Sequence, residues 1–191
     1  MEQNSLPNVL EEQIRECFGR VAWSHKTHEK CSDILNTRLN CIKLWQIILS
    51  AITTTGIMVA VFGECKEIGI LSAVLSFFLT VLNTYVKQYD LGGLAQKHAD
   101  AAVDLWDIRE SYLSLLTDIR SGHAEDDEMR KRRDALQEKL LKIYRGSPRT
   151  IAKAYKEATK ALKKLEELTF SDEEIDAILP KALRKKTSNG L

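Results

Sequence analysis

Several ordinary sequence signals are scarce or missing in this chain. The 191 residues include only three prolines, and no segment alternates apolar and polar residues as a half-buried strand does. The four cysteines form no CxxC pair and no spacing typical of a disulfide framework. Glycine-rich phosphate loops, HExxH zinc motifs and nucleophile elbows are also absent. We therefore predict an all-α protein that is not an enzyme and uses no cofactor.

Charge is balanced over the whole chain but missing from one long stretch. The 28 Lys+Arg and 27 Asp+Glu leave a formal net charge of +1, which does not indicate direct nucleic-acid binding. Two charge-free runs, Leu44 to Phe62 and Ile68 to Val86, are separated by a short break that holds Glu64, Lys66 and Glu67. Each run approaches the roughly 20 residues that a helix needs to cross a bilayer. A two-span transmembrane helical hairpin is the prediction, and a soluble buried hairpin is the alternative.

The connection between the runs determines the topology. Residues 63–67 are enough for a turn only, so both chain ends must lie on one side of the lipid bilayer. Basic residues flank the hairpin at that side, whereas the turn has only Lys66; the flanking residues are Arg38, Lys43, Lys87 and Lys97. Because basic residues are enriched in cytoplasmic loops, we expect both termini in the cytoplasm.

The chain divides into four segments. Residues 1–41 are expected to form an N-terminal amphipathic helix, 42–87 the transmembrane hairpin, 88–180 a cytoplasmic helical region and 181–191 a basic tail. Apolar residues recur every three or four positions both before and after the hairpin, so the flanking helices should pair in a cytoplasmic bundle. The expected pairing residues are Phe18, Val21, His25, His98, Leu105, Ile108 and Tyr112.

Three smaller patterns have local interpretations. His25, His28 and Cys31 share one helix face at metal-ligand spacing, but packing against the facing helix explains them without a metal. Ser147 before Pro148 is typical of a helix start, and we expect Ile151 and Tyr155 on the apolar stripe of the helix that follows. Ser171 and Glu174 match a capping box that opens a last short helix.

Each predicted span has polar residues along one face. Those of the first span are Lys43, Gln46, Ser50, Thr53 and Thr54, and those of the second are Ser72, Ser76, Thr80, Asn83 and Lys87. Small hydroxyl residues in lipid often mediate helix packing, but a one-sided stripe also suits a water-facing lumen. Since two helices cannot enclose a channel, the second interpretation requires a homo-oligomer.

The whole chain resembles the SLATT family, the SMODS- and SLOG-associating two-transmembrane effector domains. The resemblance rests on the hairpin with its charged turn, on the lead-in amphipathic helix and on the lead-out sequence YVKQYDLGGLAQKHADAAVDLW. The C-terminal sequence FSDEEIDAILPKALRKK is similar to the subgroup that accompanies reverse transcriptases.

The resemblance implies an effector of a bacterial antiviral system, located in the inner membrane. Such an effector is expected to oligomerise into a pore when a partner senses infection. The implied partner is a nucleotide-second-messenger synthase, a SLOG protein or a reverse transcriptase. A non-conducting membrane anchor that recruits a cytoplasmic partner is the alternative function.

Overall fold

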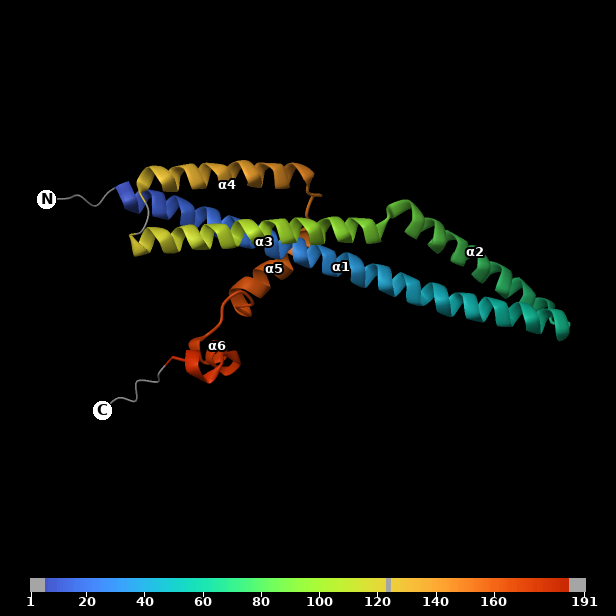
Figure 1. Ribbon diagram of the computed structural model, residues 1–191. Coiled ribbons are helices and arrows are strands. Elements are labelled where there is room, and N and C mark those ends of the chain that lie inside the picture. The colour runs from blue at the N-terminus through green and yellow to red at the C-terminus, as the bar shows by residue number, and fades with distance from the viewer. Residues whose placement is uncertain (1–5, 123–124, 186–191) are drawn as a thin grey trace.

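The computed structural model describes residues 6–122 and 125–185, which form six α-helices and a short 3-10 helix (Figure 1). The elements are α1 (Leu6–Phe62), α2 (Lys66–Tyr89), α3 (Leu91–Ser121), α4 (Asp126–Gly146), α5 (Ala152–Lys164), α6 (Asp172–Ile178) and η1 (Lys181–Leu183). No strand occurs within these two ranges, so the all-α prediction is confirmed. The first five residues of the N-terminal segment and residues 186–191 of the expected basic tail lie outside the described residues.

Helix α1 joins the N-terminal segment and the first span without a break. Its 57 residues correspond to a rod of about 85 Å at 1.5 Å per residue. Pro7 lies in the first turn, where a missing backbone N–H removes no helical hydrogen bond. The expected boundary between residues 41 and 42 therefore falls inside one continuous helix.

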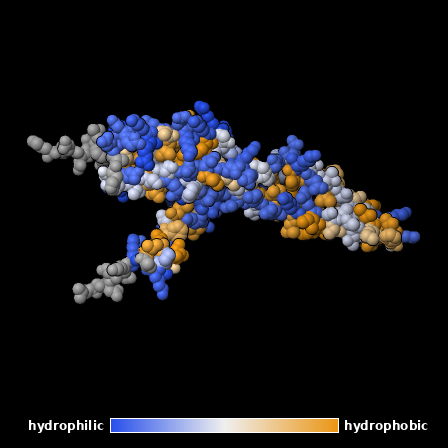
Figure 2. All heavy atoms as spheres, viewed as in Figure 1, coloured by the Kyte–Doolittle hydropathy of each residue, from blue (hydrophilic) through white to orange (hydrophobic). Residues whose placement is uncertain are grey.

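Helices α1 and α2 form the apolar hairpin, which extends away from the other helices in Figure 1. The three-residue connection contains Glu64 at a left-handed φ of 53°. Each helix has an apolar window of 18 residues, and only 6 % of each window is buried by protein. Figure 2 shows the resulting hydrophobic surface at the tip and along one edge of the hairpin. Large exposed side chains in a helix of this length are the arrangement that a bilayer requires.

Asp90 is the hinge between the hairpin and α3. Its backbone is left-handed, with φ 39° and ψ 54°, and it closes α2 and opens α3. The Asp90 carboxylate accepts a hydrogen bond of 3.0 Å from the backbone N–H of Gly93. Aspartate tolerates this conformation better than most residues because its short side chain bonds to nearby backbone. The chain thus changes direction at Asp90, and the Asp90 side chain caps the first turn of α3.

The bundle outside the hairpin is built on α1 and α3, with α4 packed beside α3 and α5 beside α1. Its main core lies between α1, α3 and the start of α4, and consists of Leu10, Ile14, Cys17, Val21, Leu105, Ile108, Tyr112, Leu115 and Met129. A second cluster, nearer the hairpin, consists of Leu35, Leu39, Leu91 and Ala95. The apolar stripes on both sides of the hairpin therefore cover one another.

Helix α5 departs from the sequence-based expectation. It begins at Ala152, not at Pro148, because Ser147 and Ile151 are both in extended conformation. The Ser147 hydroxyl instead donates to the carbonyl of Ile143, 2.7 Å away, and so belongs to the end of α4. The face that α5 buries is made of alanines, Ala154, Ala158 and Ala161, whereas Tyr155 is 56 % exposed.

The predicted start of the last helix is confirmed. Ser171 caps α6, with its hydroxyl accepting from the backbone N–H of Glu174 and the Glu174 carboxylate accepting from the backbone N–H of Ser171. This reciprocal capping box satisfies two backbone donors that have no partner in the first helical turn.

Candidate functional site

The polar stripe of the hairpin divides into two groups. Thr53 and Ser72 are buried between α1 and α2. A Cβ atom added at Gly56 would clash with the hydroxyl oxygen of Ser72, so the two helices lie close together at this glycine. These small residues allow α1 and α2 to pack closely, as small residues commonly do between membrane spans.

The other group remains on the surface of the hairpin. Ser50, Thr54, Ser76 and Thr80 are exposed, and so are Lys43 and Lys87 at the ends of the spans nearest the bundle. The hydroxyls of Thr54 and Thr80 donate to the carbonyls of Ser50 and Ser76, four residues earlier. Gln46 Nε2 donates to Asn83 Oδ1 across the hairpin at 2.8 Å.

Several residues of this exposed group line a groove of about 790 Å³ between α1 and α2. Its polar lining consists of Lys43, Gln46, Ser50, Thr54, Thr55 and Asn83. One flank of the hairpin therefore presents an amide pair, several hydroxyls and an ammonium group. Ser76 and Thr80 lie on α2 outside this groove lining.

The expected pairing stripe of the bundle lies between α1 and α3. Val21, Leu105, Ile108 and Tyr112 are fully buried in the main core, and Phe18 packs against them at its edge. His25 and His98 are buried further along the same interface. The structure thus brings together all seven residues along one interface.

The buried histidines are held by hydrogen bonds to protein groups. His25 Nδ1 donates to the carbonyl oxygen of Ala102 at 2.9 Å. His28 and His98 face each other with their Nδ1 atoms 3.0 Å apart, so one ring donates to the other. Burial, with the neighbouring His98 and His25, lowers the pKa of His28 to about 4, and burial also lowers the pKa of His98. His28 and His98 are therefore neutral near pH 7. Within residues 6–122 and 125–185, no three His, Cys, Asp or Glu side chains converge as metal ligands.

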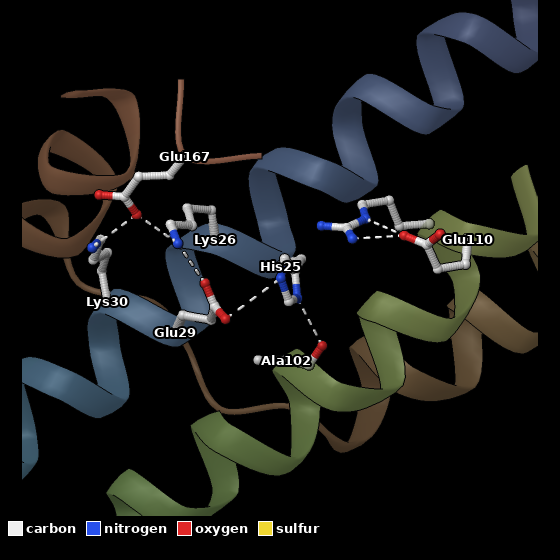
Figure 3. Close-up of polar contacts among 8 residues, drawn as sticks. His25, Lys26, Glu29, Lys30, Ala102, Glu110 and Glu167 are labelled. Carbon is white, nitrogen blue, oxygen red and sulfur yellow. Dashed lines mark hydrogen bonds and ion pairs between the residues drawn. The ribbon is translucent and has the colours of Figure 1, made fainter. Parts of the chain in front are cut away.

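A cluster of ion pairs, absent from the sequence-based prediction, joins α1 to the segment after α5 (Figure 3). The Lys26 ammonium lies 2.8 Å from carboxylate oxygens of both Glu29 and Glu167, and Lys30 lies 3.4 Å from Glu167. Burial alone would lower the pKa of Lys26, but its hydrogen bonds to Glu167 and Glu29 outweigh burial and raise it. Lys26 therefore stays charged and fastens the C-terminal part of the chain to α1.

A family model described as SMODS and SLOG-associating 2TM effector domain family 4 matches residues 10–174. The chain belongs to this family. No curated protein and no solved structure matches the chain. The match to this SLATT family runs from the start of α1 to the middle of α6, so it includes both apolar helices and nearly all of the bundle.

Membership assigns the broad class of the protein. Members of this SLATT family are described as two-transmembrane effector domains that associate with SMODS and SLOG proteins. The two apolar helices of the hairpin are the two spans, and the protein is a membrane protein.

Proposed function

We propose that this protein permeabilises a membrane as a homo-oligomer, with the groove between α1 and α2 facing a common water-filled path. The observation that supports the proposal is the polar lining of that groove on a hairpin that exposes many large apolar side chains. Polar groups that face lipid hydrocarbon are unfavourable unless they find partners. Assembly of several copies around an axis removes the groove from lipid and lets water solvate it.

The proposed membrane is the bacterial inner membrane, with both termini in the cytoplasm. Support comes from the basic residues on the bundle side of the hairpin, among them Lys43 and Lys87, against the single Lys66 in the turn. In this orientation the bundle meets cytoplasmic partners. Its proposed partner is a nucleotide-second-messenger synthase, a SLOG protein or a reverse transcriptase.

The connection between bundle and spans suggests how a partner acts on the hairpin. Helix α1 runs through both parts as one rigid element, and α2 joins α3 at Asp90. A change in how α1 packs on α3 therefore tilts the spans relative to one another. We propose that the bundle holds the assembly closed and that a partner opens it by repacking this interface.

The test is leakage from vesicles that contain the purified protein. The variant Ser50→Ala with Thr54→Val removes two exposed hydroxyls from the groove and leaves the buried pair Thr53 and Ser72 in place. Ion or dye leakage should fall sharply while the cross-linked oligomer keeps its size, because a more apolar path disfavours the water column.

A matched control uses a threonine outside the groove lining. Thr84 is exposed on α2, and its hydroxyl donates to the carbonyl of Thr80 as the Thr54 hydroxyl does to that of Ser50. Vesicles that contain Thr84→Val should therefore leak at the parental rate. Parental leakage in the groove variant at equal protein density would overturn the proposed path. A smaller oligomer in that variant would show instead that the hydroxyls hold copies together.

A membrane anchor that recruits a partner is the second candidate function. The segment after α5 favours it, because this segment exposes several large apolar side chains, namely Leu165, Phe170, Ile175, Ile178 and Leu183. Parent vesicles that remain tight under every partner condition, together with capture of the partner that depends on Phe170 and Ile178, would support the anchor.

A further inference from the structure

A second cleft, far from the hairpin groove, opens between α1 and the connection from α4 to α5. Its volume is about 940 Å³, within the range typical of small-molecule sites. One wall of the cleft is α1. The other wall consists of the end of α4, the non-helical residues 147–150 and the start of α5. The lining of the cleft includes Glu16, Gly19, Arg20, Trp23, Tyr144, Arg149 and Tyr155.

Local structure keeps this cleft open. Gly19 is a helical residue on the α1 wall, and a Cβ atom added there would meet nothing within 4 Å. The non-helical residues 147–151, of which Ser147 and Ile151 are extended, separate the start of α5 from the end of α4. Ser24 and Tyr144 join the two walls by a hydrogen bond of 2.9 Å between their hydroxyls. The opening is therefore built by ordered backbone and a cross-wall contact.

The side chains of the cleft combine aromatic rings with guanidinium groups. Trp23, Tyr144 and Tyr155 all line it, and the two tyrosines are 44 % and 56 % exposed. Arg149 has no ion pair or hydrogen bond to another described residue. Arg20 pairs with the exposed Glu16 at 3.4 Å and donates a long hydrogen bond to the Cys17 Sγ at 3.9 Å. Guanidinium groups bind phosphate through paired N–H donors, and aromatic side chains stack on nucleobases.

We propose that this cleft binds a nucleoside phosphate, with the base against the aromatic side chains and the phosphate between Arg20 and Arg149. The proposal concerns binding alone. It goes beyond the leak pathway, because binding is measured without a membrane and its failure would leave the vesicle result untouched.

The position of the cleft excludes a lipid headgroup as its occupant. His28 is the lining residue of α1 nearest the hairpin, and Lys43 marks the start of the first span. The 15 helical steps from His28 to Lys43 correspond to about 22 Å of helix at 1.5 Å per residue. A headgroup at the membrane surface therefore does not reach the rings and guanidinium groups, and a freely diffusing phosphate compound does.

The experiment titrates ATP without added metal into the full-length protein in detergent, followed by calorimetry. The parent should bind saturably with one ATP per chain. Arg149→Gln should weaken binding at least about tenfold, the equivalent of one charged hydrogen bond. The control Arg145→Gln changes an exposed arginine of α4 that does not line the cleft, so it should bind ATP like the parent.

A steric series tests the location of the site. Gly19→Leu should abolish ATP binding because its side chain enters the cleft, whereas Gly19→Ala should retain most of it. Both replacements favour the helical conformation, and the space around the Cβ position accommodates them. Equal thermal stability of the two variants confirms that neither perturbs the fold.

Adenosine and tripolyphosphate separate the two halves of the proposed ligand. Each should bind at least about tenfold more weakly than ATP, because each lacks one of the two contacts. No saturable binding of ATP would overturn the proposal. Tripolyphosphate as tight as ATP would overturn the aromatic half, and unchanged affinity in Gly19→Leu would overturn the assigned cleft.

Discussion

His28 of α1 and His98 of α3 face each other in the buried interface, with their Nδ1 atoms 3.0 Å apart. The side chains are 3 % and 1 % exposed, so water does not stabilise a positive charge on either ring. The pair lies between the main core and the cluster next to the hairpin. A change of charge at this point therefore acts on the contact between α1, which continues into the first span, and α3, which follows the second span at Asp90.

The folded protein should lose stability as the pH falls from 6.5 to about 4. The pKa of His28 is lowered from 6.5 to about 4 in the folded state, so between these values the unfolded chain binds a proton that the folded chain excludes. Stability is therefore full above pH 6.5 and falls below it, by up to roughly 3 kcal/mol at His28 once the pH is below 4. Thermal unfolding in detergent across this range is the measurement.

The variant His28→Gln identifies the source of this pH dependence. Glutamine supplies a donor and an acceptor to His98 but does not titrate. The decrease in melting temperature between pH 7 and pH 4.5 should be clearly smaller in the variant than in the parent. An unchanged decrease would assign the effect to other groups.

The α1–α3 interface should not tolerate a charge. Leu105 and Ile108 are fully buried in the main core, so Leu105→Asp or Ile108→Asp should reduce stability by about 3 kcal/mol, the usual order for an unpaired buried charge. Val103, which is 66 % exposed on the same helix, gives the matched control Val103→Asp with little effect. Equal melting temperatures for Leu105→Asp and Val103→Asp would contradict the assignment of the core.

Patterns repeated over many residues were the part of the fold that could be predicted. A charge-free run longer than a soluble core helix indicates a span, and two apolar stripes that leave one hairpin on the same side must cover each other. The all-α class followed from those signals. The capping box at Ser171 followed from its own local spacing of serine and glutamate. Each is a regular or local pattern that a single segment carries.

Features that depend on placement between segments were not predictable. Lys30 and Glu167 are 137 positions apart, and their contact requires the position of α5, which buries alanines that carry little hydrophobic signal. The expected helix start at Ser147 and Pro148 was wrong because the Ser147 hydroxyl serves the end of α4. The hairpin stripe could not be divided into packing and exposed groups, because helical periodicity does not tell which flank meets the partner helix.

Tyr112→Phe should retain or raise stability. The Tyr112 hydroxyl is buried and has no hydrogen bond of good geometry to a described residue. Burial, with the neighbouring Cys17 thiol, raises its pKa to about 12. An unpaired buried hydroxyl destabilises the folded state by roughly 1 kcal/mol or more, so its removal with the ring kept in place should be neutral or favourable. Thermal unfolding measures the change, and a loss of stability would indicate that the hydroxyl is paired through an ordered water.

Gly56 of α1 contacts Ser72 of α2 within the hairpin. A methyl group added at Gly56 would clash with the Ser72 hydroxyl oxygen but would lie 3.5 Å from the Ser72 Cβ, an ordinary contact. Gly56→Ala should therefore destabilise the protein by about 1 kcal/mol, the lower end of the usual effect of overpacking. Adding Ser72→Ala should restore most of that loss.

The two substitutions and their combination form a double-mutant cycle, read as melting temperatures in detergent. Gly69→Ala is the matched control, because its added methyl group would lie 3.4 Å from the Cβ of Ala60 and meet no closer atom. We expect Gly69→Ala to be close to neutral and the Gly56 and Ser72 effects to be strongly non-additive. Additive effects would mean that α1 and α2 do not approach each other at this glycine, and the assignment of Thr53 and Ser72 to helix packing would then fail with it.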